Sequence, residues 1–349
     1  MKAVRSVLLT HPGSYKCMVL ARYIRQTRPE IRIHLLADNL RDRIFRTRFC
    51  DVVHKGGREH LRTLLEQEEI DLLLPVHSRE MDALVGDATL QPWLDWIGNR
   101  ESYQKLSDKK AFEDLVRETG VRAPRSWTDW EEAPLPLVLK PTRGSGARGV
   151  VYLRNPAELE ASRCRFPALE DHVLQEHVQG KGVGFSVFCR EGKILKGFAH
   201  QRVAEFPATG GSSMVRAPTH PGGMEAIASV LVEKVGWSGF AMFEFKRTPE
   251  GDDVLIECNP RIWGSIHQGL RNGTDLLEPL LGPMSSSSRW EVDAEAFTHL
   301  APFHLLSFLQ GWVRGIRGPA RTWRSRTVSS WPDVSWKEDP KAFLRMLLP

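Results

Sequence analysis

The sequence has few cysteines, and none stands at the short spacing that a metal-binding cysteine pair requires. Its 349 residues include five, at Cys17, Cys50, Cys164, Cys189 and Cys258. An odd, dispersed set in a chain of this size is typical of reduced thiols, which predicts a cytoplasmic location. The same scatter argues against a structural zinc site.

Long apolar runs are also missing. No stretch approaches the roughly 20 apolar residues of a membrane-spanning helix, so we expect no transmembrane segment. The first ten residues lead into His11, Pro12 and Gly13 without the apolar core or cleavage site of a signal peptide. The net charge of +5 suits small anionic ligands. Because there is no long Lys/Arg run and no base-stacking motif, we expect no nucleic-acid partner.

The first part of the chain predicts an α/β domain. Short β-rich runs at residues 6–10, 31–38 and 70–76 alternate with helical patterns, which indicates parallel strands and a Rossmann-like opening. The turn after the first strand lacks the GxGxxG pattern, so a dinucleotide is not supported. His77 and Glu80 follow the third strand, where they could either touch a substrate or begin a helix.

A glycine-rich loop joins two strands in the middle of the chain. Residues 137–141 end in Lys140 and Pro141, the loop spans residues 142–149, and a strand resumes at residue 150. Glycines let backbone N–H groups approach phosphate oxygens, and Lys140 and Arg148 add positive charge. The loop is not a Walker motif, because no GKS/T leads into a helix. An ordinary turn is the alternative.

Two carboxylates and an amide mark a second hairpin. Residues 239–246 and 253–257 are expected to pair as antiparallel strands, which brings Glu244 close to Glu257 and Asn259. Hard oxygen ligands of this kind suit Mg²⁺ bound to phosphate, and nearby Arg261 suits a phosphate or a carboxylate. The alternative is a pair of solvated surface charges.

The last part of the chain has a different composition. Residues 285–288 are a run of serines that predicts a linker, and residues 296–312 have the apolar density of a helix. Trp323, Trp331 and Trp336 follow among basic residues. This tail fits either a membrane surface or cation–π packing of the extension on its own domain.

In order along the chain, these segments resemble the ATP-grasp superfamily. The resemblance is strongest to the carbamoyl-phosphate-synthase-like and biotin-carboxylase-like branch, and within it to a group of predicted ATP-dependent carboligases. It covers about residues 1 to 280 and rests on residues 107–109, 138–141, 144–149, 174–178, 200–202, 210–213, 242–245 and 256–265.

The resemblance implies a mixed α/β and α+β fold. A Rossmann-like pre-ATP-grasp domain at residues 1–105 would precede a two-subdomain ATP-grasp fold. The lid subdomain would span residues 106–190 and the subdomain with the metal site residues 191–284. Residues 285–349 would form a helical, Trp/Arg-rich extension.

The resemblance also implies roles for individual residues, with ATP and Mg²⁺ or Mn²⁺ as cofactors. The metal would be held by Glu244, Glu257 and Asn259. Catalytic contacts to the phosphates and the acceptor would come from Lys140, Arg202 and Arg261. The nucleotide would be bound by Lys109, Lys140, Gly144, Ser145, Gly146, Arg148, Gln175, Glu176, His177, Val178 and Ile256.

One position departs from the pattern of the superfamily. Many members carry a carboxylate for the ribose hydroxyls about seven residues after the hinge glutamate, and here that position is Val183. Ribose contacts must therefore come from elsewhere.

The function that the resemblance implies is ATP-dependent ligation of a small carboxylate to an amine through an acylphosphate, with release of ADP and phosphate. The protein would then be a carbon–nitrogen ligase. Bicarbonate activation of the carboxylase type and nucleotide binding without turnover are the alternatives. A homodimer is compatible with the resemblance.

Overall fold

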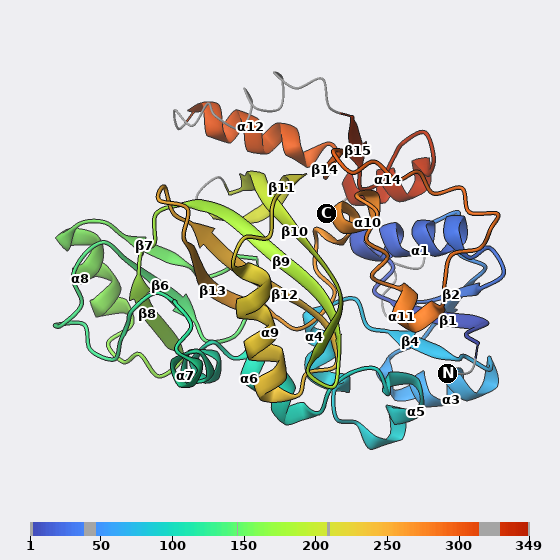
Figure 1. Cartoon of the computed structure of the whole chain (residues 1–349), viewed down its shortest axis with the longest axis horizontal. Helices are drawn as coiled ribbons and strands as arrows, with labels where there is room; N and C mark the ends of the chain where they lie inside the picture. The colour runs from blue at the N-terminus through green and yellow to red at the C-terminus, as the bar shows by residue number, and fades with distance from the viewer. Residues whose placement is uncertain (1–2, 38–46, 145, 208–209, 314–328, 348–349) are drawn as a thin grey trace.

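The strands of the molecule form three sheets, which differ in size and in strand direction. The structure is a computed structural model, and it describes residues 3–37, 47–144, 146–207, 210–313 and 329–347. Within these ranges, a parallel four-stranded sheet lies at one end, a seven-stranded sheet in the middle and an antiparallel four-stranded sheet at the other end (Figure 1).

The parallel sheet confirms the predicted Rossmann-like opening. Its strands have the order β3-β2-β1-β4, and β1 is buried along its whole length. Helix α1 begins after Ser14, whose side chain accepts a hydrogen bond from the Lys16 N–H and so caps the helix. The elements of this part are β1 (Ser6–Thr10), α1 (Tyr15–Thr27), β2 (Arg32–Ala37), β3 (Val52–Lys55), η1 (Arg58–His60), α3 (Leu61–Gln67) and β4 (Leu72–Leu74).

A run of helices leads into the small antiparallel sheet, whose strands have the order β5-β8-β6-β7. This sheet has its own apolar core around Leu137, Leu139 and Leu174. The helices before the sheet are α4 (Ser78–Leu84), η2 (Ala88–Leu90), α5 (Gln91–Leu94), α6 (Arg100–Ser107) and α7 (Lys109–Thr119), and α8 (Pro156–Arg165) connects two of its strands. The strands are β5 (Ser126–Trp127), β6 (Leu137–Pro141), β7 (Val151–Leu153) and β8 (His172–Glu176).

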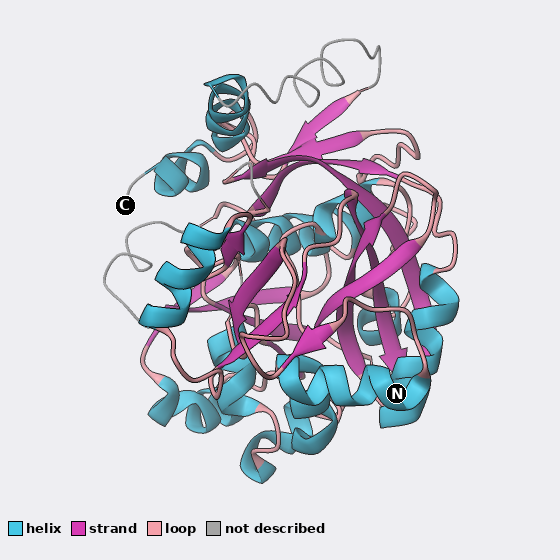
Figure 2. Cartoon of the chain, turned by 90° about the vertical axis from the view of Figure 1, so that its left-hand side faces the viewer, coloured by secondary structure: helices cyan, strands magenta, loops and turns pink. Residues whose placement is uncertain are grey.

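The central sheet has the order β13-β12-β9-β10-β11-β14-β15. Figure 2 shows its long strands running side by side, with helices packed around them. One continuous apolar core joins this sheet to the parallel sheet, and Trp96 links them by packing on Phe188 and Phe240. The elements are β9 (Lys181–Arg190), β10 (Lys193–Phe206), β11 (Ser212–Pro218), α9 (Met224–Val235), β12 (Gly239–Arg247), β13 (Asp253–Asn259), α10 (Ile266–Arg271) and α11 (Glu278–Leu281).

The structure differs from two expectations about this architecture. The expected boundary at residue 190 is the end of β9, but β9 belongs to the central sheet, so the small sheet ends with β8. The C-terminal extension is not only helical, because β14 (Phe297–His299) and β15 (Ser330–Pro332) add two strands to the central sheet. The predicted helix at 296–312 is therefore a strand followed by α12 (Phe303–Val313). Apolar density alone does not distinguish these two structures.

The C-terminal segment packs back onto the N-terminal domain. Helix α14 (Pro340–Leu347) lies beside α1 (Figure 1), where Ala342 and Val334 pack on Met18. The guanidinium of Arg271 lies 3.9 Å from the ring centre of Trp331, which confirms the cation–π interpretation for this tryptophan. Trp336 packs edge-on against Phe343, and Trp323 lies outside the described residues. None of the described helices has the length and apolar character needed to cross a membrane.

Candidate active site

A cavity of about 490 Å³ lies where the small sheet faces the central sheet. Every predicted site residue within the described ranges lines it, and Ser145 lies outside those ranges. The small sheet, its loops and the start of α7 supply Lys109, Lys140, Gly144, Gly146, Arg148, Gln175, Glu176, His177 and Val178. The central sheet and the segment after it supply Arg202, Glu244, Ile256, Glu257, Asn259 and Arg261.

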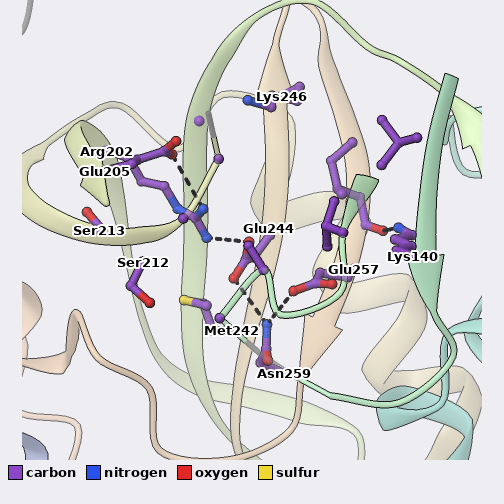
Figure 3. A pocket seen from close by; sticks show the side chains of 18 of the residues that line it. Lys140, Arg202, Glu205, Ser212, Ser213, Met242, Glu244, Lys246, Glu257 and Asn259 are labelled. Carbon is purple, nitrogen blue, oxygen red and sulfur yellow. Dashed lines mark hydrogen bonds and ion pairs between the residues drawn. The ribbon is translucent and has the colours of Figure 1, made fainter. Parts of the chain in front are cut away.

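The predicted hairpin brings the two carboxylates together. Glu244 on β12 is the register partner of Glu257 on β13. The amide nitrogen of Asn259 lies 3.1 Å from Glu244 Oε1 and 3.2 Å from Glu257 Oε1 (Figure 3). Both carboxylates therefore point at one place in the cavity, so they are not solvated surface charges.

Arg202 on β10 holds the first carboxylate. Its guanidinium forms an ion pair with Glu244 Oε2 and lies 3.5 Å from Glu205 Oε1. Burial raises the pKa of Glu244, and the charge of Arg202 offsets only part of this effect. Burial therefore favours the neutral form of Glu244, whereas the ion pair with Arg202 favours the ionised form.

Two lysines act on the second carboxylate. Lys109 Nζ lies 3.8 Å from Glu257 Oε2, and Lys140 Nζ donates to the carbonyl of Ile256 at 3.4 Å. Burial raises the pKa of Glu257, but the charges of Lys109 and Lys140 outweigh it and hold the pKa below its ordinary value. Glu257 is therefore ionised at neutral pH.

The glycine-rich loop and the strand β8 form the opposite wall. Gly144 and Gly146 have φ angles of +125° and +70°, which favour glycine and leave the backbone open to an approaching ligand. At the end of β8, the N–H groups of Glu176 and His177 donate to the carbonyls of Arg125 and Pro136. These two N–H groups therefore hold the shape of the segment.

Comparison with known proteins identifies this arrangement. Residues 106–265 match the family model of the ATP-grasp domain. This stretch includes both the glycine-rich loop and the carboxylate hairpin.

One curated protein is similar over part of its length. The 5-formaminoimidazole-4-carboxamide-1-(beta)-D-ribofuranosyl 5'-monophosphate synthetase of Pyrobaculum neutrophilum is 26% identical over 123 residues, which are 35% of each chain. The match thus spans about a third of that relative.

Solved structures extend the similarity to most of the fold. The biotin carboxylase domain of the 2-oxoglutarate carboxylase of Hydrogenobacter thermophilus has a TM-score of 0.62 at 16% identity, covering 84% of this chain and 73% of that one. An L-amino acid ligase from Bacillus licheniformis has a TM-score of 0.59 at 14% identity, covering 82% and 77%. At these identities the likeness concerns the fold.

The donor set of the cavity fits a hard divalent cation. Two carboxylates and one amide converge, and such oxygen ligands are those that Mg²⁺ and Mn²⁺ prefer. In the structure the Asn259 amide nitrogen faces the carboxylates, while its Oδ1 accepts from Arg261 Nη2 at 2.7 Å. A cation would replace the N–H donor, and the amide would then turn its oxygen toward the ion.

Val183 does not face the cavity. Its side chain is 2% exposed and belongs to the core, while its neighbour Gly182 lines the cavity opposite Lys246. A Cβ at residue 182 would lie 3.0 Å from Arg202 Cδ. Gly182 therefore leaves the space through which Arg202 reaches Glu244.

His77 and Glu80 have the structural role that was the alternative to substrate contact. The His77 ring accepts from the Arg79 N–H, and Glu80 Oε2 accepts from the His77 N–H at 3.0 Å. Thr10 also donates to Glu80. The two side chains thus form a capping box at the start of α4.

Some lining residues were not among the predicted site residues. Met242 and Lys246 share a face with Glu244, and the alternation of side chains along a strand was the signal that could have found them. Tyr15 and Lys16 come from α1 and line the cavity together with Ser265. No local pattern connects these residues, because they lie about 250 positions apart in the sequence.

Lys16 is a buried basic group at that end of the cavity. Its Nζ donates to the carbonyl of Val76 at 2.6 Å and lies 3.5 Å from the carbonyl of Ile262. Burial, with a further contribution from the charge of Arg261, lowers the pKa of Lys16 to about 7. This lysine is therefore partly neutral at physiological pH.

Proposed function

We propose that the protein is an ATP-dependent carboxylate–amine ligase that forms a carbon–nitrogen bond and releases ADP and phosphate. One observation carries this proposal: Glu244, Glu257 and Asn259 converge in the same cavity as two lysines and the glycine-rich loop. The ATP-grasp domain and the likeness of the fold to an amino acid ligase support it.

ATP is assigned to the space between the two sheets. Val178 is the hinge residue whose N–H we expect to face the adenine, because Glu176 and His177 use theirs within the protein. Ile256 supplies an apolar wall, and Lys246 lines the cavity opposite Gly182. Gln175 is expected to support the hinge.

The phosphates are assigned to the basic groups of the cavity. Lys109, Lys140 and Arg148 would bind phosphate oxygens together with the backbone of Gly144 and Gly146. Mg²⁺ or Mn²⁺ held by Glu244, Glu257 and Asn259 would neutralise charge on the phosphate oxygens.

The proposed reaction has two steps, formation of an acylphosphate and transfer of its acyl group to the amine. A carboxylate oxygen of the substrate attacks the γ-phosphorus, the bond to the β–γ bridging oxygen breaks, and ADP leaves with that electron pair. The amine nitrogen then attacks the carbonyl carbon of the acylphosphate, and phosphate leaves and takes the proton of the amine. Arg261 would orient the carboxylate or the γ-phosphate, and Arg202 would face the acceptor while it holds Glu244. Water must be excluded from the intermediate.

The experiment is an assay of Mg²⁺-dependent ADP release across a panel of carboxylic acids, with hydroxylamine as a trap. We expect one acid to give a hydroxamate and an equal amount of ADP. Glu257→Ala should lower this activity by about 10²-fold or more. Glu250→Ala, in the exposed turn of the same hairpin, is the matched control. Unchanged turnover in Glu257→Ala would contradict the proposal.

Bicarbonate activation is the second candidate. It is favoured by the likeness of the fold to a biotin carboxylase domain whose structure contains MgADP and bicarbonate. ADP release that bicarbonate stimulates without any organic acid would select it. ATP binding without turnover on either substrate class would instead indicate a nucleotide-binding module.

The proposed location and partners follow from the thiols and from the likeness of the fold. None of the five cysteines, all of them described in the structure, forms a disulfide, which fits the reducing cytoplasm. The biotin carboxylase domain just named is described as a dimer. We therefore expect a homodimer that acts on small molecules and binds no nucleic acid.

A further inference from the structure

Three potential metal ligands gather on the parallel sheet, outside the cavity. His34 lies on β2, His54 lies on the edge strand β3, and Glu68 is the C-cap residue of α3. None of these elements contributes to the described lining of the cavity. Among the described residues, this is the one group of at least three His, Cys, Asp or Glu side chains whose ligand atoms all lie within 4.8 Å of one another.

The register of the sheet places the two histidines together. His34 is opposite Val52 and Leu36 is opposite His54, so the histidines are two positions apart on neighbouring parallel strands and share a face. Their rings are nearly parallel, with an angle of 6° and centres 5.1 Å apart. His34 Nδ1 lies 2.8 Å from His54 Nε2 and 3.9 Å from Glu68 Oε2.

These distances are close to those of a metal site. Two ligand atoms at zinc–nitrogen distance from a tetrahedral ion lie about 3.3 Å apart. The histidine nitrogens would need to separate by about half an ångström, and the carboxylate would need to approach by about as much. His54 and Glu68 are partly exposed, so their side chains have room to make both changes.

The electrostatic environment keeps the histidines available as ligands. His34 is fully buried, and burial lowers the pKa of both His34 and His54, which favours the neutral form of both rings. A neutral imidazole has one nitrogen free to bind a metal. Glu68 adds a negative charge, which offsets part of the charge of a divalent ion.

We propose that His34, His54 and Glu68 form a binding site for one divalent transition metal ion of the zinc class, with water completing the coordination. Two imidazole nitrogens and one carboxylate oxygen are typical zinc ligands and poor ligands for Mg²⁺. The ion would tie the edge strand β3 to β2 and to the end of α3. The site uses no cysteine, so the dispersed cysteines do not bear on it.

The test uses the full chain, stripped of metal with a chelator and titrated with ZnCl2 or CoCl2. We expect one equivalent of Zn²⁺ to bind outside the cavity, to raise the Tm by several degrees, and to be unaffected by millimolar Mg²⁺. Bound Co²⁺ should give the visible absorption of a tetrahedral site. His54→Ala should weaken binding of Zn²⁺ by about tenfold or more.

Three further variants make the result specific. His60→Ala changes an exposed histidine nearby and should leave Zn²⁺ binding unchanged. Glu68→Gln removes the carboxylate at a partly exposed position, so it tests the site even if His54→Ala fails to fold. Glu257→Ala should retain this Zn²⁺ ion, which separates the site from the cavity.

Absence of Zn²⁺ binding by the stripped wild-type protein would overturn the proposal. Binding that neither His54→Ala nor Glu68→Gln weakens would overturn it as well, and would leave a hydrogen-bonded histidine pair only. Either result is independent of the ligase assay.

Discussion

At the scale of single residues, the ion pair between Arg202 and Glu244 has consequences for both stability and activity. The two side chains are only 15% and 18% exposed, so each depends on the other for compensation of its charge. Arg202→Met should leave Glu244 as a buried carboxylate without its main partner. We expect a loss of about 2–3 kcal/mol in the free energy of unfolding and a strong loss of ADP formation.

A double variant separates these two effects. Glu244→Gln in the Arg202→Met background removes the uncompensated charge and should recover much of the stability, as urea unfolding would measure. It should not recover activity, because the proposed metal ligand is lost. Equal stability of Arg202→Met and the wild type would show that the pair does not hold Glu244.

The lowered pKa of Lys16 predicts that the stability of the protein depends on pH. Its pKa is about 7 in the folded protein against an ordinary value of 10.5. Between these values the unfolded chain binds a proton that the folded chain does not bind, so stability should rise with pH across this window. The contribution approaches about 1.4 kcal/mol per pH unit at most. Lys16→Met should remove it.

The measurement is urea unfolding of the wild type and Lys16→Met at pH 7, 8 and 9. The wild type should gain more stability between pH 7 and pH 9 than the variant does. Lys193→Met, at an exposed position at the start of β10, is the control and should keep the slope of the wild type. Identical slopes in Lys16→Met and the wild type would contradict the lowered pKa.

At the scale of the element, strand β9 shapes the cavity through a position without a side chain. Gly182→Ala would place a Cβ 3.0 Å from both Arg202 Cδ and Glu205 Oε1. Arg202 would have to shift by a few tenths of an ångström, which would disturb its ion pair with Glu244 while the strand stays paired. We expect activity to fall by about 10–100-fold with a small change in stability.

Gly223→Ala provides a matched control for this substitution. Gly223 precedes α9, has a φ of −82°, and a Cβ there would meet nothing within 4 Å. The two variants are compared by steady-state ADP formation and by thermal unfolding. We expect Gly182→Ala to be less active than Gly223→Ala, and both to unfold at similar temperatures. Full activity of Gly182→Ala would mean that Arg202 need not occupy its present position.

At the scale of the whole molecule, the C-terminal segment ties distant parts together through buried charges. Asp333, just after β15, binds Arg216 on β11 at 2.5 Å and His267 on α10 at 3.0 Å, and Arg216 and Asp333 are fully buried. Asp333→Ala should cost about 3–5 kcal/mol in the free energy of unfolding, because it leaves a buried guanidinium unpaired.

An exposed ion pair offers the comparison. Arg122 and Asp252 are more than half exposed, so Asp252→Ala should cost at most about 1 kcal/mol. Both variants are compared by urea unfolding. Similar small losses would show that the C-terminal segment does not stabilise the fold through Asp333.

Much of the fold could be predicted because its signals are local. The β-rich runs and helical periods of the first 75 residues place β1, α1, β2 and β4 where the structure has them. The predicted helix at 296–312 was wrong at its start, because pairing of β14 with β11 depends on a strand that lies about 80 residues away. A local pattern carries no information about such a partner.

The candidate site also combines features with local sequence signals and features that depend on long-range contacts. The amino-acid sequence by itself determined the glycine-rich loop, the carboxylate hairpin and their order along the chain, because turn chemistry and strand alternation act over a few residues. Only the tertiary structure decided that Arg202 reaches Glu244, that Lys16 is buried at the cavity, and that His34, His54 and Glu68 meet. These contacts depend on the order and register of strands, which long-range packing selects.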